Sequence, residues 1–204
     1  KMVKDILSKA IKTLILEEPF YGLFVVGLNK SYRTDIPTAG VSQNGIGVQL
    51  AVNPEYLESL NDDTRKGLTK HEVLHISFGH LLIRDKYSDK QLFNVAADLE
   101  INQYIKPSCL PDGGLVLDSF PELKLPVKAG TDVYYKLLQE AKQNGTSPSL
   151  DKLLGEMDGN SQYCHATWEE FENLPDSEKK LIKRQIEHQI KEVAQQTERR
   201  RGNI

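Results

Sequence analysis

The pentapeptide His71-Glu72-Val73-Leu74-His75 constrains the fold of this chain more than any other feature. On an α-helix with about 3.6 residues per turn, positions four apart differ by only about 40° of rotation, so both imidazoles leave one face and can bind one ion. Helical zinc sites use this spacing, and the carboxylate between the histidines takes a proton from water instead of binding the metal. The pattern predicts a helix that carries two metal ligands, His71 and His75, and a general base, Glu72.

The residues around the pentapeptide favour one long helix. Asn61 to Thr64 supply N-cap candidates and acids for a first turn, and apolar residues then continue at helical spacing, without a proline, to Leu82. We therefore expect the motif to lie in the middle of a continuous helix. The alternative is that both histidines are buried on a core helix and satisfied by hydrogen bonds alone.

A catalytic zinc ion has three protein ligands and one open position, so the motif needs a third ligand from elsewhere. A second, strongly apolar helix is predicted from Asp89 to Ile105, and Asn94, Asp98 and Asn102 form one polar stripe along it. A carboxylate among apolar neighbours is costly to bury without a cation or hydrogen bonds. Asp98 is therefore the predicted third ligand, and the two asparagines are candidates for orienting the ligands.

Three alternatives stay open at this point. His80 lies nine residues beyond His71, so on a continuous helix it faces away, and a structural or ligand-supporting role is expected. Glu100 points about 200° away from Asp98 and is expected to be a solvent-facing helix acid. Asp98 itself could cap a turn in a structural polar network instead of binding metal.

The remaining elements indicate an α+β fold, in which the motif helix packs with a second ligand-bearing helix against a small mixed or antiparallel sheet. The expected elements are a helix over Val3 to Ile15, a strand over Tyr21 to Leu28, a turn-rich connection over Asn29 to Gly40, a hairpin over Val41 to Val52, a short helix from Pro54 to Leu60, a loop over Pro107 to Gly130, a helix from Asp132 to Gln143 capped by Thr131, and a basic helix over Ser177 to Arg201.

The second arm of the hairpin, Ile46 to Val52, alternates apolar and small or polar residues, so we expect it to be half-buried. It stands just before the motif helix. It could be an edge strand to which an extended substrate adds as a further strand, or an ordinary buried strand of the sheet.

Composition and charge argue against nucleic-acid binding and against a membrane-spanning segment. The chain has 204 residues, 39% hydrophobic and 27% charged, with a formal net charge of -3, which gives no global reason to expect nucleic acid or an anionic membrane. Its longest apolar run, Leu23 to Leu28, is far too short to cross a bilayer. Two cysteines form no C-x-x-C pair and suit a reducing compartment, so a cytoplasmic location is expected.

This chain resembles the N-terminal domain of a known family, the predicted metal-dependent peptidases with von Willebrand factor A-like domains. The resemblance covers most of the chain and rests on Pro37 to Val41, Asn53 to Glu55, Lys70 to His75, Gly79 to Leu81, Asn94 to Asp98 with Ile101 and Asn102, and His165 with Trp168. It implies a zincin-like core and Asp98, rather than Glu100, in the site. It also implies a C-terminal von Willebrand factor A-like domain, absent from this sequence, and a MoxR-type AAA+ ATPase as a partner.

The sequence thus predicts a single zincin-like domain over residues 1–204, with a core over about 1–106, a loop-rich region over 107–176 and a basic helix over 177–204. We expect one zinc ion, a peptide or protein substrate, and hydrolysis through a water activated by Glu72. His165 is the candidate donor for the carbonyl oxygen in the transition state. The alternative is a metal-binding interaction module, without turnover, in an ATPase-linked assembly.

Overall fold

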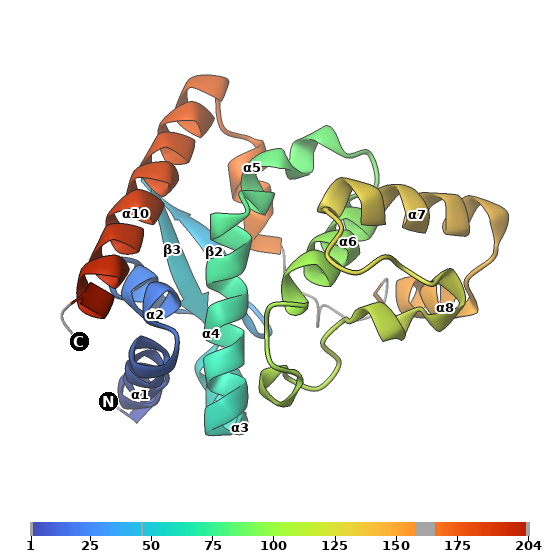
Figure 1. Cartoon of the computed structure of the whole chain (residues 1–204). Helices are drawn as coiled ribbons and strands as arrows, with labels where there is room; N and C mark the ends of the chain where they lie inside the picture. The colour runs from blue at the N-terminus through green and yellow to red at the C-terminus, as the bar shows by residue number, and fades with distance from the viewer. Residues whose placement is uncertain (1, 46, 158–165, 203–204) are drawn as a thin grey trace.

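The computed structural model describes residues 2–45, 47–157 and 166–202. It is a mixed α and β structure with a small three-stranded sheet. In Figure 1 helix α4 runs between two groups of elements: the sheet with α1, α2 and α10 on one side, and α6, α7 and α8 on the other. The two predicted ligand-bearing helices therefore face each other at the boundary between these groups.

The N-terminal helices correct one prediction. Helix α1 spans Met2–Glu17, as expected, but α2 spans Pro19–Val26, where a strand was predicted. A short apolar run of this kind does not distinguish a strand from a buried helix, and Pro19 at the first helical position favours the helix. A side chain is excluded at Gly22, because a Cβ there would lie 2.4 Å from the Ile15 backbone nitrogen. The two helices thus pack at close range.

The sheet has the order β1-β3-β2. Strand β1 (Asn29–Tyr32), which begins inside the expected turn-rich connection, pairs parallel with β3 (Gly47–Val52). Strand β2 (Ala39–Asn44) pairs antiparallel with β3 from Ala39↔Val52 to Asn44↔Gly47, which confirms the predicted hairpin. Since β3 is the central strand and is hydrogen-bonded on both sides, the alternative of an ordinary buried strand is correct and that of a substrate-binding edge strand is wrong. Ile46 lies outside the described residues.

Helices α3 (Pro54–Ser59), α4 (Asp62–Ser77) and α6 (Lys90–Asn102) begin within one residue of the predicted starts. The side chains of Asn53, Asn61 and Asp89 each accept a hydrogen bond from a backbone N–H in the first turn of the following helix. The predicted continuous helix through Leu82 is wrong, however. Helix α4 ends at Ser77, Gly79 has φ +70°, and a separate turn of helix, α5 (His80–Ile83), follows.

The remaining chain contributes to both groups of elements. After α6 the chain makes single 3₁₀ turns at Pro107–Cys109, Leu117–Ser119 and Pro121–Leu123 and is otherwise irregular until Gly130, as predicted. Helices α7 (Thr131–Asn144) and α8 (Pro148–Met157) follow, but the residue capping α7 is Gly130 and not Thr131. The short α9 (Glu169–Glu172) leads to α10 (Asp176–Gly202), the predicted basic helix, which packs on α2 and β3.

The irregular segment after α6 is fixed directly against the motif helix. A Cβ at Gly67 would lie 1.8 Å from the Cys109 carbonyl oxygen, so only glycine lets the Pro107–Cys109 turn rest on α4. This contact places the following residues over the N-terminal half of α4. Among the described helices, none is both long and apolar enough to cross a membrane.

Candidate metal centre

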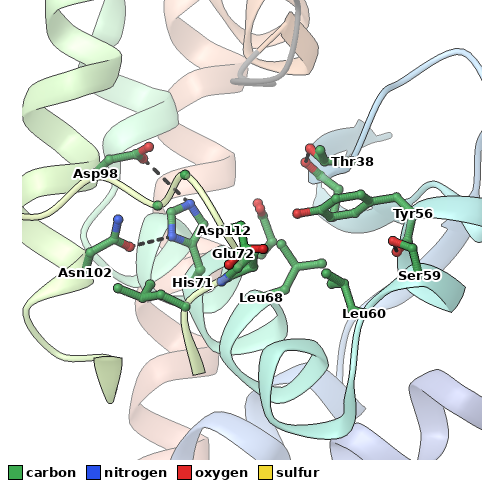
Figure 2. Close-up of a pocket in the computed structure, with 15 residues that line it drawn as sticks. Thr38, Tyr56, Ser59, Leu60, Leu68, His71, Glu72, Asp98, Asn102 and Asp112 are labelled. Atoms are coloured by element: carbon green, nitrogen blue, oxygen red, sulfur yellow. Dashed lines mark hydrogen bonds and ion pairs between the residues drawn. The ribbon is translucent and has the colours of Figure 1, made fainter. Parts of the chain in front are cut away.

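Three predicted ligands converge between α4 and α6. His71 and His75 leave one face of α4, Asp98 faces them from α6, and one donor atom from each lies within 4.8 Å of the others. His75 Nε2 is 3.0 Å from His71 Nε2 and 3.1 Å from Asp98 Oδ1, and His71 Nε2 is 3.6 Å from Asp98 Oδ1. His75 and Asp98 are buried and His71 is half-buried. Figure 2 shows His71 and Asp98 beside Glu72 at one side of a pocket.

This triangle of donor atoms has the size that a metal ion requires. Two ligand atoms at about 2.1 Å from a tetrahedral zinc ion stand roughly 3.4 Å apart. The three observed separations of 3.0, 3.1 and 3.6 Å bracket that value. Two imidazole nitrogens and a carboxylate oxygen are also a donor set that catalytic zinc uses. The residues present therefore fit a metal ion, and two of them, His71 and Asp98, also line the pocket.

The second ring nitrogen, Nδ1, of His71 and of His75 lies at hydrogen-bond distance from another side chain. His71 Nδ1 lies 2.8 Å from Asn102 Oδ1, and Asn102 Nδ2 donates to the Leu115 carbonyl at 2.7 Å. His75 Nδ1 lies 2.9 Å from His80 Nδ1. Asn102 thus contacts one of the predicted ligands, His71. Asn94 instead accepts a hydrogen bond from Arg84 Nε at 3.0 Å.

The structure corrects the predicted direction of His80 and the predicted exposure of Glu100. His80 is 1% exposed and contacts His75, because the break at Gly79 turns it back toward the site. Glu100 lies under His80 with its side chain only 16% exposed, so the prediction of a solvent-facing acid is wrong. Burial raises the pKa of Glu100, but hydrogen bonds from His80 and Thr131 outweigh burial and bring the pKa below its usual value. Neither residue belongs to the three-donor cluster.

Glu72 is only 6% exposed and lines the pocket beside His71 and Asp98. Burial, and secondarily the charge of Asp98, raise the pKa of Glu72 to about 8. A cation among the three donors would favour the ionised carboxylate instead. Glu72 is therefore a carboxyl group positioned to hold or release a proton close to a metal ion.

The pocket has a volume of about 320 Å³. It lies between the start of β2, helices α3, α4 and α6, and the irregular segment after α6. Its lining residues are Thr38, Ala39, Tyr56, Ser59, Leu60, Leu68, His71, Glu72, Asp98, Asn102 and Leu110 to Gly114. The pocket thus has Tyr56, Leu60 and Leu68 on one side and the polar groups of His71, Glu72 and Asp98 on the other.

Sequence reasoning missed Tyr56. Its ring points across the pocket toward the side where Glu72 lies (Figure 2). Burial raises the pKa of Tyr56, and the charges of Asp112 and Glu72 raise it further, so the hydroxyl keeps its proton and can donate. Tyr56 belongs to no sequence motif, and only the position of α3 in the fold brings it to the pocket.

The edge of the sheet near the pocket belongs to β2 and is partly covered. Thr167 Oγ1 donates to the Val41 carbonyl at 2.7 Å, and the Gln43 N–H donates to Glu170 at 3.2 Å. The pocket therefore meets this edge only at its beginning, at Thr38 and Ala39. The buried Trp168 packs edge-on against the His75 ring, with 4.8 Å between centroids. His165, the predicted transition-state donor, lies outside the described residues.

The comparisons with known proteins agree with this geometry. A model of the family described as "Putative metallopeptidase domain" matches residues 4–202, almost the whole chain. The chain belongs to this metallopeptidase family. It is also 31% identical, over 104 residues, to a protein of Thermotoga maritima described only as "Uncharacterized protein". That match covers 50% of this chain but 26% of the relative, so it spans about a quarter of the relative's length. No solved structure matches.

Proposed function

We propose that this member of the metallopeptidase family is a zinc-dependent peptidase, with His71, His75 and Asp98 as ligands of one zinc ion and Glu72 as general base. The observation that carries the proposal is the triangle of donor atoms with sides of 3.0, 3.1 and 3.6 Å beside a buried glutamate in a pocket. Membership of the family supports a metal cofactor and peptide hydrolysis.

A zinc ion held by His71, His75 and Asp98 would lower the pKa of a bound water and polarise the carbonyl group of a peptide bond. Glu72 takes a proton from the attacking water as the bond from water oxygen to carbonyl carbon forms. It then passes that proton to the leaving amine as the C–N bond breaks. Asn102 and His80 hold the imidazole rings of His71 and His75 in place throughout.

Tyr56 is proposed to donate its hydroxyl hydrogen to the carbonyl oxygen, on which negative charge develops in the transition state. Tyr56→Phe is expected to lower kcat on the order of 100-fold with little change in KM or zinc affinity, because the lost bond forms only in the transition state. Steady-state kinetics on a fluorogenic peptide measure this. Tyr104→Phe, which alters a half-exposed ring outside the pocket lining, is the matched control. Equal kcat for Tyr56→Phe and wild type would rule out this role.

We further propose that the core is zincin-like, that the chain forms one domain and acts in the cytoplasm, and that longer relatives add a von Willebrand factor A-like domain and associate with an AAA+ ATPase. The partial coverage of the Thermotoga relative favours a second candidate function. In this candidate the domain is a metal-binding interaction module, and the remainder of a longer protein supplies the activity.

Peptide cleavage by the zinc-loaded protein separates these functions. A mixture of unstructured peptides incubated with wild type is expected to yield new amino termini, detected by mass spectrometry. Dialysis against a chelator should stop cleavage, and one equivalent of zinc should restore it. A zinc-loaded, folded protein that cleaves none of a broad peptide mixture would favour the interaction module.

A further inference from the structure

A buried chain of hydrogen-bonding groups extends from His75 away from the pocket. His75 Nδ1 lies 2.9 Å from His80 Nδ1, and His80 Nε2 lies 3.0 Å from Glu100 Oε2. Glu100 Oε2 also accepts hydrogen bonds from the Thr131 hydroxyl and, at 3.2 Å, from the Thr131 N–H. His75, His80 and Thr131 are buried, at 0%, 1% and 5% exposure. The chain therefore connects one candidate metal ligand to the start of α7 through groups that water hardly reaches.

The partners at the far end of this chain fix the proton on His80. Glu100 is an acceptor, and the Thr131 hydroxyl donates to it, so the oxygen of that hydroxyl offers a lone pair to His80 Nε2 at 3.1 Å. Both neighbours of His80 Nε2 are thus acceptors. His80 Nε2 must carry the hydrogen, and in the neutral ring His80 Nδ1 is then the acceptor.

At the other end of this series of hydrogen bonds, His75 requires an acceptor such as His80 Nδ1. A histidine that binds a metal through Nε2 carries its hydrogen on Nδ1, and in an interior site that N–H needs a partner. For His71 the partner is Asn102 Oδ1, whose amide orientation is set by its bond to the Leu115 carbonyl. For His75 it is His80 Nδ1. The two ligands therefore have different supports, an amide for one and a histidine backed by a carboxylate for the other.

We propose that His80, held by Glu100 and Thr131, is a positioning residue that accepts the His75 Nδ1 hydrogen and so presents the His75 Nε2 lone pair to the metal. This inference rests on the proposed zinc centre but not on turnover. The left-handed Gly79 makes the arrangement possible, since it turns the chain so that His80 returns under His75 only five residues later. Gly79 has φ +70°, a backbone conformation in which residues other than glycine are strained.

Two substitutions at His80 separate an acceptor from a space-filling ring. His80→Asn keeps an oxygen near the position of Nδ1, whereas His80→Leu keeps bulk but offers no acceptor. We expect zinc affinity to fall about 10- to 100-fold in His80→Leu, the usual cost of losing the partner of a ligand, and no more than about threefold in His80→Asn. Competition with a chromophoric chelator at fixed pH measures both, and thermal unfolding of the metal-free proteins checks that each variant is folded.

A measurement on the wild type covers the case in which a variant does not fold. ¹⁵N side-chain NMR of the zinc-loaded protein should show the hydrogen of His75 on Nδ1 and that of His80 on Nε2, with His80 Nδ1 unprotonated. A doubly protonated His80, or equal zinc affinity in His80→Leu and wild type, would overturn the inference. Wild type that binds zinc but cleaves no peptide contradicts only the proposed activity, whereas wild type that takes up no zinc overturns the zinc centre and this inference together.

Discussion

Glu72→Gln is expected to bind zinc as tightly as the wild type and to hydrolyse peptides at least about 100-fold more slowly, because the amide cannot take the proton of the attacking water. Glu72 lies in the pocket beside the ligands but outside the donor triangle, so its replacement removes no metal-binding atom. Since glutamine has nearly the same shape, the buried site should keep its packing. Metal stoichiometry and peptide kinetics on the same preparation test both halves of the prediction.

Glu58→Gln is the matched control for Glu72→Gln. Glu58 lies exposed on α3, and its side chain is not among the residues that line the pocket. This variant should cleave peptides at the wild-type rate. If Glu72→Gln kept full activity, a general base elsewhere would be required; if it lost zinc together with activity, Glu72 would have to be reassigned as a ligand.

Asp98→Asn is expected to weaken zinc binding by more than about 100-fold, since changes to the partners of ligands alone cost about 10- to 100-fold. Asp98 supplies the one anionic donor of the triangle, at 3.1 Å from His75 Nε2 and 3.6 Å from His71 Nε2. Without it two neutral imidazoles face a divalent ion in a largely buried site. Chelator competition gives the affinity, and hydrolysis should fall in parallel at limiting zinc.

Asp118→Asn provides the comparison, because Asp118 is an exposed acid of the irregular segment and does not line the pocket. Its zinc affinity should equal that of the wild type. The metal-free Asp98→Asn protein should be no less stable than metal-free wild type, since the change removes a buried carboxylate. Unchanged zinc affinity in Asp98→Asn would leave the third ligand to be sought in residues other than Asp98.

The parts of the site that follow from helical spacing were predictable from the sequence. His71, Glu72 and His75 share one stretch of α4, and Asp98 and Asn102 lie one turn apart on α6, so each helix fixes the relative directions of its own side chains. What brings the two sets together is the packing of α4 against α6. That packing was inferred from chemistry, because an acid on an apolar helix face needs a partner.

The parts that depend on a change of backbone direction were not predictable in this way. A single left-handed glycine, Gly79, reverses the expected direction of His80, and with it the role of Glu100. Tyr56 reaches the pocket from α3, on a different element from any motif. The apolar segment of α2 is too short for its sequence to distinguish the periodicity of a helix from that of a strand. Each error arose where long-range packing decides the local structure.

The most direct measurement is anomalous scattering at the zinc edge from crystals of protein purified without chelators and supplied with one equivalent of zinc. One peak per chain is expected, within about 2.3 Å of His71 Nε2, His75 Nε2 and an oxygen of Asp98. A peak held by other residues, or no peak from protein that contains no zinc by elemental analysis, would contradict it.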